Sequence, residues 1–250
     1  MHASWTPIAQ TGERNLSDSL VYDVARFIGS PFCFDLVGYE NIQTPGPAIY
    51  ISNHLGALGP IETILSVPIR FYPWIIAEMM DFKRAPEYLF NDFVRPVLHL
   101  QGWVGIRFST LLTKISVRLL RAIGSVSIDR FGGMTTDGFR HSLRLLREGK
   151  NLLIFPEDPL LSLDSDTLMR HFMPGFATLC SLFQSDECTL LPVYPLAVHA
   201  TSETIAIGTP EFFHPHGHHR DAINAFSQIV ETRVRTLYID LQKASDDLLS

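Results

Sequence analysis

A histidine followed by a glycine- and proline-interrupted turn is the residue best suited to chemistry in this chain. The apolar run at 48–52 ends in Asn53 and His54, and the next residues, LGALGPIETIL, lead into an apparent helix. Ligand sites in α/β proteins gather at the carboxyl ends of strands. An imidazole there titrates near neutral pH and can remove a proton from a hydroxyl group. The alternative is a structural or merely exposed histidine, but other segments favour the catalytic interpretation.

Short apolar runs between helical stretches indicate the elements that would position this histidine. They predict the buried strands of an α/β sheet at 48–52, 73–77, 125–129, 151–155 and 190–198. Apolar residues at helical spacing predict helices at 18–32, 136–148 and 221–249. The chain has no internal repeat, low-complexity tract or linker. We therefore expect a single α/β domain spanning 1–250.

Composition excludes several classes of protein. A hydrophobic content of 46% over 250 residues supports a large buried core and argues against disorder. A net charge of -6 and a pI near 5.9 give no global attraction for nucleic acid. Cys33, Cys180 and Cys188 form no CxxC pair, which fits a reducing compartment. No secretory signal or transmembrane helix is predicted, so we expect a cytoplasmic protein.

Four sequence blocks resemble, in order and spacing, the phospholipid and glycerol acyltransferase family, whose members acylate glycerol 3-phosphate and lysophosphatidate. The blocks are Asn53-His54, GSVSIDR at 124–130, Phe155-Pro156-Glu157 and LPVYP at 191–195. The resemblance extends over residues 35–212. It implies the glycerolipid acyltransferase fold, a mixed and mostly parallel sheet flanked by helices.

The resemblance also implies a mechanism. His54 would remove the proton from an acceptor hydroxyl, which then attacks the thioester of acyl-CoA or acyl carrier protein, and no cofactor is needed. The family's orienting Asp, five positions later, is here Gly59. If a helix begins at Pro60, Glu62 lies on nearly the same face as position 59 and could reach back toward His54. The alternative is that Glu62 is a first-turn carboxylate favoured by the helix dipole.

An acceptor site is the next implication of the resemblance. Its residues would be Asn53, Asp129, Arg130, Pro156 and Glu157. Arg130 would contact an acceptor phosphate, the alternative being a surface arginine after a strand. After Glu157 the family continues Gly-Thr-Arg-Ser, whereas this chain continues Asp-Pro-Leu-Leu. The acceptor is therefore expected to differ from glycerol 3-phosphate in charge or head group, with Arg170 and His171 as candidates to compensate for the missing arginine.

The stretch from Trp103 to Ile123 contains four cations and no acid. On a helix the cations fall within an arc of about 60°, and apolar residues group on another side. The cations are Arg107, Lys114, Arg118 and Arg121. Such a helix suits an anionic membrane surface or the phosphates of CoA. The alternative is an ordinary surface helix whose apolar side faces the core.

The run HPHGHHR at 214–220 is histidine-rich, but no carboxylate or cysteine is spaced with it as a preorganised metal site requires. We therefore expect no metal site. The main functional hypothesis is a peripheral membrane acyltransferase of phospholipid biosynthesis, associated with the inner face of a membrane and acting on a lysophospholipid, a glycerol phosphate or a related alcohol. A catalytically weak acyl-chain or lysolipid-binding protein and an acyl-thioester hydrolase are the alternatives.

Overall fold

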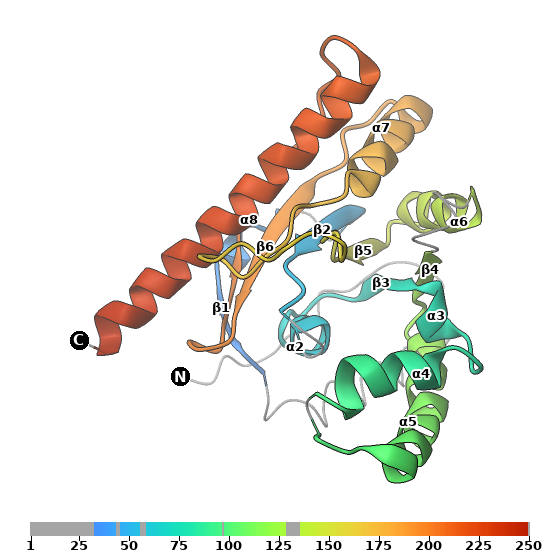
Figure 1. The fold of residues 1–250 in the computed structure, drawn as a ribbon. Helices are drawn as coiled ribbons and strands as arrows, with labels where there is room; N and C mark the ends of the chain where they lie inside the picture. Colours follow the sequence, from blue (N-terminus) through green and yellow to red (C-terminus); the bar gives the residue numbers. More distant parts are fainter. Residues whose placement is uncertain (1–32, 44–45, 56–58, 97, 129–135, 250) are drawn as a thin grey trace.

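A computed structural model describes residues 33–43, 46–55, 59–96, 98–128 and 136–249, which form a seven-stranded sheet with helices on both faces (Figure 1). The strands are β1 (Asp35–Val37), β2 (Ala48–Ser52), β3 (Phe71–Ile76), β4 (Val126–Ile128), β5 (Asn151–Ile154), β6 (Val193–His199) and β7 (Thr204–Ile207). Their spatial order is β1-β7-β6-β2-β5-β3-β4. Every neighbouring pair is parallel except β6 and β7, which are antiparallel.

The central strand carries the candidate histidine at its carboxyl end. β2 pairs with β5 on one side and β6 on the other, and all five of its residues are buried. A strand covered on both faces can be apolar throughout, which accounts for the sequence AIYIS. The carboxyl ends of β2, β3, β4, β5 and β6 meet along one edge of the sheet. His54 lies two residues beyond β2 on this edge.

Helices cover the two faces unequally. They are η2 (Tyr39–Asn41), α2 (Gly59–Ser66), α3 (Ala77–Met80), α4 (Ala85–Leu89), η3 (Phe90–Val94), α5 (Gly102–Ala122), α6 (Thr136–Arg147), α7 (Gly175–Glu187) and α8 (His219–Leu249). Side chains of α6, α7 and α8 pack with Ile49 and Ile51 in the larger core. The segment of α2 packs with Tyr50 and Phe71 on the opposite face. α3, α4, η3 and α5 form a separate helical layer beside β3 and β4 (Figure 1).

Most predicted elements are present, with shifted ends. β2 matches its prediction, β3 starts two residues earlier than predicted, and β6 lies at 193–199 instead of 190–198. The helices predicted at 136–148 and 221–249 correspond to α6 and α8. The sequence analysis missed β1, η2, β7, α3, α4, η3 and α7. The helix predicted at 18–32 lies outside the described residues. The single α/β fold with a mixed, mostly parallel sheet is confirmed.

Candidate active site

Asn53 fastens the carboxyl end of β2 to β6. Its side-chain Nδ2 donates to the carbonyl oxygen of Val198 at 3.0 Å, and the N–H of Val198 donates to Asn53 Oδ1 at 2.8 Å. The side chain is buried, with 1% of the residue exposed. The side-chain amide of Asn53 thus extends the hydrogen bonding between β2 and β6 past the end of their backbone pairing. The geometry therefore supports a positioning role for Asn53, and its predicted contact with substrate stays a prediction.

The side chain of Glu157, which follows the neighbouring strand β5, binds the backbone of His54. The backbone N–H of His54 donates to Glu157 Oε1 at 2.7 Å, and the N–H of Arg170 donates to Glu157 Oε2 at 2.9 Å. Only 7% of Glu157 is exposed. Hydrogen bonds to a buried carboxylate are among the stronger ones in proteins. One side chain thus couples the turn after β2 to the segment after β5, 103 residues later in the chain.

The imidazole of His54 is half-buried and packs edge-on against the ring of Phe155, with the ring centroids 5.5 Å apart and the planes at 75°. Phe155 directly follows β5 and precedes Pro156, whose carbonyl oxygen accepts a hydrogen bond from Met173 N–H at 2.8 Å. Of the predicted residues, Glu157 therefore contacts the backbone N–H of His54 through its side chain, whereas the Pro156 carbonyl pairs with Met173. Packing against an aromatic ring restricts the rotamers of His54 and keeps the imidazole at the sheet edge.

Glu62 lies in the first turn of α2 and is half-buried. Burial is the main cause that raises its pKa, and the carboxylate of Glu203 raises that pKa further. In the described part of the chain the structure gives no hydrogen bond between Glu62 and His54. The role of Glu62 as the orienting partner therefore stays a prediction, and the charge that influences its pKa belongs to a second acid, Glu203.

Gly59, where the family resemblance leads one to expect an aspartate, is in close contact with His54 itself. A Cβ atom at this position would lie 2.5 Å from the carbonyl oxygen of His54 and 3.1 Å from Cβ of Leu55. A side chain at position 59 therefore requires the backbone to move. Its φ angle is outside the left-handed region, so the constraint comes from close approach to a neighbouring peptide.

Two predicted acceptor-site residues, Asp129 and Arg130, lie outside the described residues. β4 ends at Ile128, on the same sheet edge as β2 and β5. Their contact with an acceptor stays a prediction.

A network on α8, which the sequence analysis missed, holds the segment that follows Glu157. Glu231 accepts from Phe172 N–H at 2.9 Å and lies 2.9 Å from His171 Nδ1, while Arg235 donates to Glu231 at 2.9 Å and to the carbonyl oxygen of Arg170 at 3.1 Å. His171 and Arg170 thus take part in holding this segment. The signal in the sequence was an acid and an arginine four residues apart on α8.

α5 exposes its apolar side chains. Its buried positions are small or β-branched and recur every four residues, at Gly105, Ser109, Thr113 and Val117. The large apolar residues face outward, and Trp103 is 71% exposed. The alternative in which the apolar side of this helix faces the core is therefore wrong. All four predicted cations are exposed, although Arg121 also donates to the carbonyl oxygen of Met80 at 3.1 Å.

The described residues contain no group of three or more His, Cys, Asp or Glu side chains arranged to hold a metal ion. Nor do they contain a helix with the length and apolar character needed to cross a bilayer.

Comparison with known proteins identifies the fold. No protein-family model matches the chain, and no curated protein matches it in sequence. Among solved structures it is similar to the 1-acyl-sn-glycerophosphate (LPA) acyltransferase PlsC from Thermotoga maritima, with a TM-score of 0.55 and 14% sequence identity. The match covers 91% of this chain and 83% of that one. The chain therefore has the fold of a glycerolipid acyltransferase.

Proposed function

We propose that this protein is an O-acyltransferase that uses an acyl thioester and acylates a lysophospholipid or related lipid alcohol at a membrane surface. The observation that carries the proposal is the clamp of Glu157 on the His54 peptide, at the carboxyl edge of a sheet with an acyltransferase fold. In such a fold the strand ends are where ligands bind. The donor would be acyl-CoA or acyl carrier protein, with no cofactor.

The proposed reaction needs one proton carrier. His54 takes the proton from the acceptor hydroxyl as its oxygen attacks the thioester carbonyl, and a new C–O bond forms. The C–S bond then breaks, and the departing thiolate takes the proton back from the imidazolium. The products are an ester and a free thiol. Glu157 would keep the His54 backbone at a fixed distance from the acceptor, since positioning supplies much of the rate in such reactions.

The exposed face of α5 supports association with a membrane. Cations beside exposed apolar side chains are the composition that binds anionic lipid headgroups and the boundary of the acyl region. Arg107 lies over the ring of Trp103, with Cζ 5.5 Å from the ring centroid, so charge and aromatic surface are presented together. This face would bring the sheet edge to lipid acceptors.

A non-catalytic binding protein is the second candidate. The observation that favours it is that position 59 carries no carboxylate and that, among the described residues, the structure gives no hydrogen bond from Glu62 to His54. Hydrolysis of the thioester by water is the third candidate and would leave the roles of His54 unchanged.

Release of free thiol from acyl-CoA, with and without a lysolipid acceptor, distinguishes the three candidates. Acceptor-dependent release that disappears in His54→Ala supports the transferase. The control is His141→Ala on α6, another half-buried histidine. Release independent of acceptor indicates a hydrolase. No release from folded protein with any donor tested rejects both enzymatic functions.

A further inference from the structure

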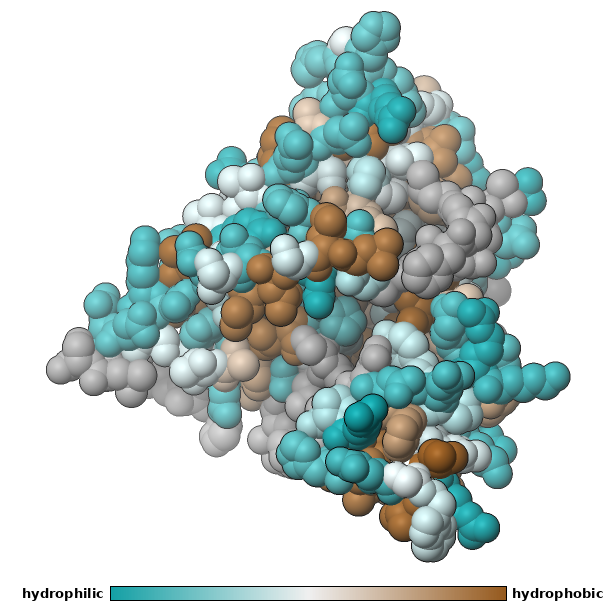
Figure 2. Space-filling model, viewed as in Figure 1, coloured by the Kyte–Doolittle hydropathy of each residue, from teal (hydrophilic) through white to brown (hydrophobic). Residues whose placement is uncertain are grey.

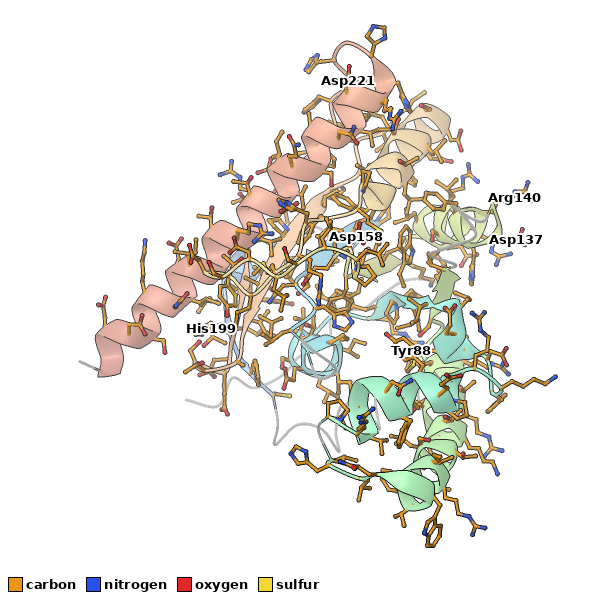
Figure 3. All side chains as sticks on the ribbon, viewed as in Figure 1. Tyr88, Asp137, Arg140, Asp158, His199 and Asp221 are labelled. Atoms are coloured by element: carbon orange, nitrogen blue, oxygen red, sulfur yellow. The ribbon has the colours of Figure 1, made fainter. Side chains whose placement is uncertain are left out.

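The segment after Glu157 exposes four leucines beside the candidate site. They are Leu160, Leu161, Leu163 and Leu168, which we call the leucine lip, and they are between 45% and 78% exposed. Figure 2 shows an apolar patch over the segment that follows β5, which in Figure 1 runs between α8 and α2. Asp158, which opens the segment, lies near the middle of the view in Figure 3. The lip begins three residues beyond the side chain that holds His54.

Hydrogen bonds within the segment pair part of its backbone. Leu160 N–H donates to Asp158 Oδ1 at 3.0 Å, and Leu161 N–H donates to the carbonyl oxygen of Asp158 at 3.2 Å. Leu168 N–H donates to the carbonyl oxygen of Asp164 at 3.0 Å, and Asp164 N–H donates to that of Met169 at 2.9 Å. Backbone groups paired in this way can contact hydrocarbon without losing a hydrogen bond to water.

Contacts to the rest of the protein hold the leucine lip in place. Arg170 Nε donates to the carbonyl oxygen of Leu161 at 2.9 Å, and Arg235 on α8 donates to Thr167 Oγ1 and to the carbonyl oxygen of Arg170. These contacts hold the backbone that carries the leucines, whose side chains are exposed in this arrangement. Exposed apolar surfaces of this kind mark sites of contact with apolar partners.

The charge of the segment indicates which lipid would lie on it. Three carboxylates, of Asp158, Asp164 and Asp166, accompany the leucines. Hydrogen bonds from Thr167 lower the pKa of Asp164, so this group stays ionised. Arg170 offsets one of these charges, so that residues 158–170 keep a formal charge of -2 (three Asp and one Arg). Arg235 lies 3.7 Å from Asp164 but is shared with Glu231 on its own helix. A phosphate group beside the lip would be repelled.

We propose that the hydrocarbon chain of an uncharged lipid alcohol lies on the leucine lip while its hydroxyl group reaches His54. This inference rests on the proposed function for the role of the hydroxyl, whereas the binding surface does not depend on turnover. The substrate class it names is a lipid alcohol without phosphate, such as a monoacylglycerol, and it assigns the lip as the residues that hold that substrate's chain.

Sedimentation of the full chain with vesicles tests the lip without requiring catalysis. The vesicles contain phosphatidylcholine with either monoacylglycerol or the same mole fraction of lysophosphatidate. The lip variants are compared at high salt, which screens the α5 cations. The two lipids are compared at low salt in protein whose four α5 cations are replaced by Gln, so that repulsion from the acidic segment is retained. The variant combines Leu160→Ser, Leu161→Ser and Leu163→Ser. The control combines Leu182→Ser, Leu190→Ser and Ile229→Ser, which are similarly exposed elsewhere.

Burial of the exposed part of each leucine in the bilayer should strengthen vesicle affinity about fivefold per residue. The lip variant, which loses three leucines, should therefore bind monoacylglycerol vesicles about 100-fold more weakly. The control should stay within about twofold of the unmodified protein on the same scale. Equal weakening in both variants, or no weakening in either, overturns the proposed lip. Tighter binding to lysophosphatidate vesicles than to monoacylglycerol vesicles, by the protein with an intact lip and Gln at the four α5 positions, overturns the uncharged substrate.

Thiol release measured on the same samples separates this inference from the proposed function. If vesicle binding depends on the lip and prefers monoacylglycerol, but no acceptor supports release of thiol, the lip stands as a binding surface and the acyltransferase function fails.

Discussion

Replacing Gly59 by alanine tests the physical reason why this position differs from the aspartate that the family resemblance leads one to expect. The added Cβ would lie 2.5 Å from the carbonyl oxygen of His54, about 1 Å inside an ordinary contact. Because the obstacle is backbone, relief requires the turn or the His54 peptide to shift. Overpacking of this kind costs about 1–3 kcal/mol of unfolding free energy. A shift of about 1 Å at His54 would lower the acyl-transfer rate by about 100-fold.

Gly175→Ala is the matched control, since Gly175 opens α7 as Gly59 opens α2. A Cβ at position 175 would meet Trp74 at 3.7 Å, an ordinary contact. That change should raise the free energy of unfolding by up to about 1 kcal/mol through the entropy of the unfolded chain. Urea unfolding gives the stabilities and thiol release gives the rates. Gly59→Ala with unchanged stability would refute the close approach, and lost stability with an unchanged rate would refute its link to His54.

Three further predictions concern charged groups. Burial and Glu203 raise the folded-state pKa of Glu62 above its unfolded value, so its favourable contribution, complete below the unfolded pKa, is lost as pH rises through the folded pKa. Glu62→Gln should therefore raise the free energy of unfolding at neutral pH and raise it less in acid. If the change instead lowers stability and also lowers the rate of thiol release, by up to about 10⁴-fold, Glu62 orients His54. Glu157→Gln places an amide N–H₂ donor where a backbone N–H donor points, and it should lower the free energy of unfolding by about 1–3 kcal/mol. The control Glu211→Gln, at a more exposed ion pair, should lower it by less than about 1 kcal/mol. Equal losses in urea unfolding would contradict the clamp. Replacing the four α5 cations by Gln should weaken sedimentation with anionic vesicles by about 1 kcal/mol per cation at low salt and less at high salt. Unchanged binding at low salt would show that the α5 cations do not contact the membrane.

Local sequence was sufficient for the elements that are long or buried on both sides. The run at 48–52 is apolar at every residue because β2 is covered on both faces, and this pattern predicted the strand with its observed ends. α6 and α8 were predicted because their apolar residues recur at helical spacing. These features depend on a residue and its near neighbours, so the sequence carries them directly.

Short elements could not be predicted in the same way. β1 has three residues and β7 has four, and each forms by pairing with strands distant in the chain. α3, α4 and η3 follow one another between 77 and 94 as brief segments with few residues to show a period. Their formation depends on packing against α5, which a local pattern does not contain.

In the candidate site, too, the sequence identified the residues and the tertiary structure determined which of them are in contact. The residue types around His54 and Glu157 were sufficient to single out both, and the resemblance to acyltransferases assigned the chemistry. Only the folded chain joins them, because parallel pairing of β2 with β5 brings the ends of the two strands together across 103 residues. At the same sheet edge the side-chain amide of Asn53 bonds to β6, and Gly59 lies close to the carbonyl oxygen of His54. Composition and spacing determined which groups can do chemistry, and the register of the sheet decided which of them meet.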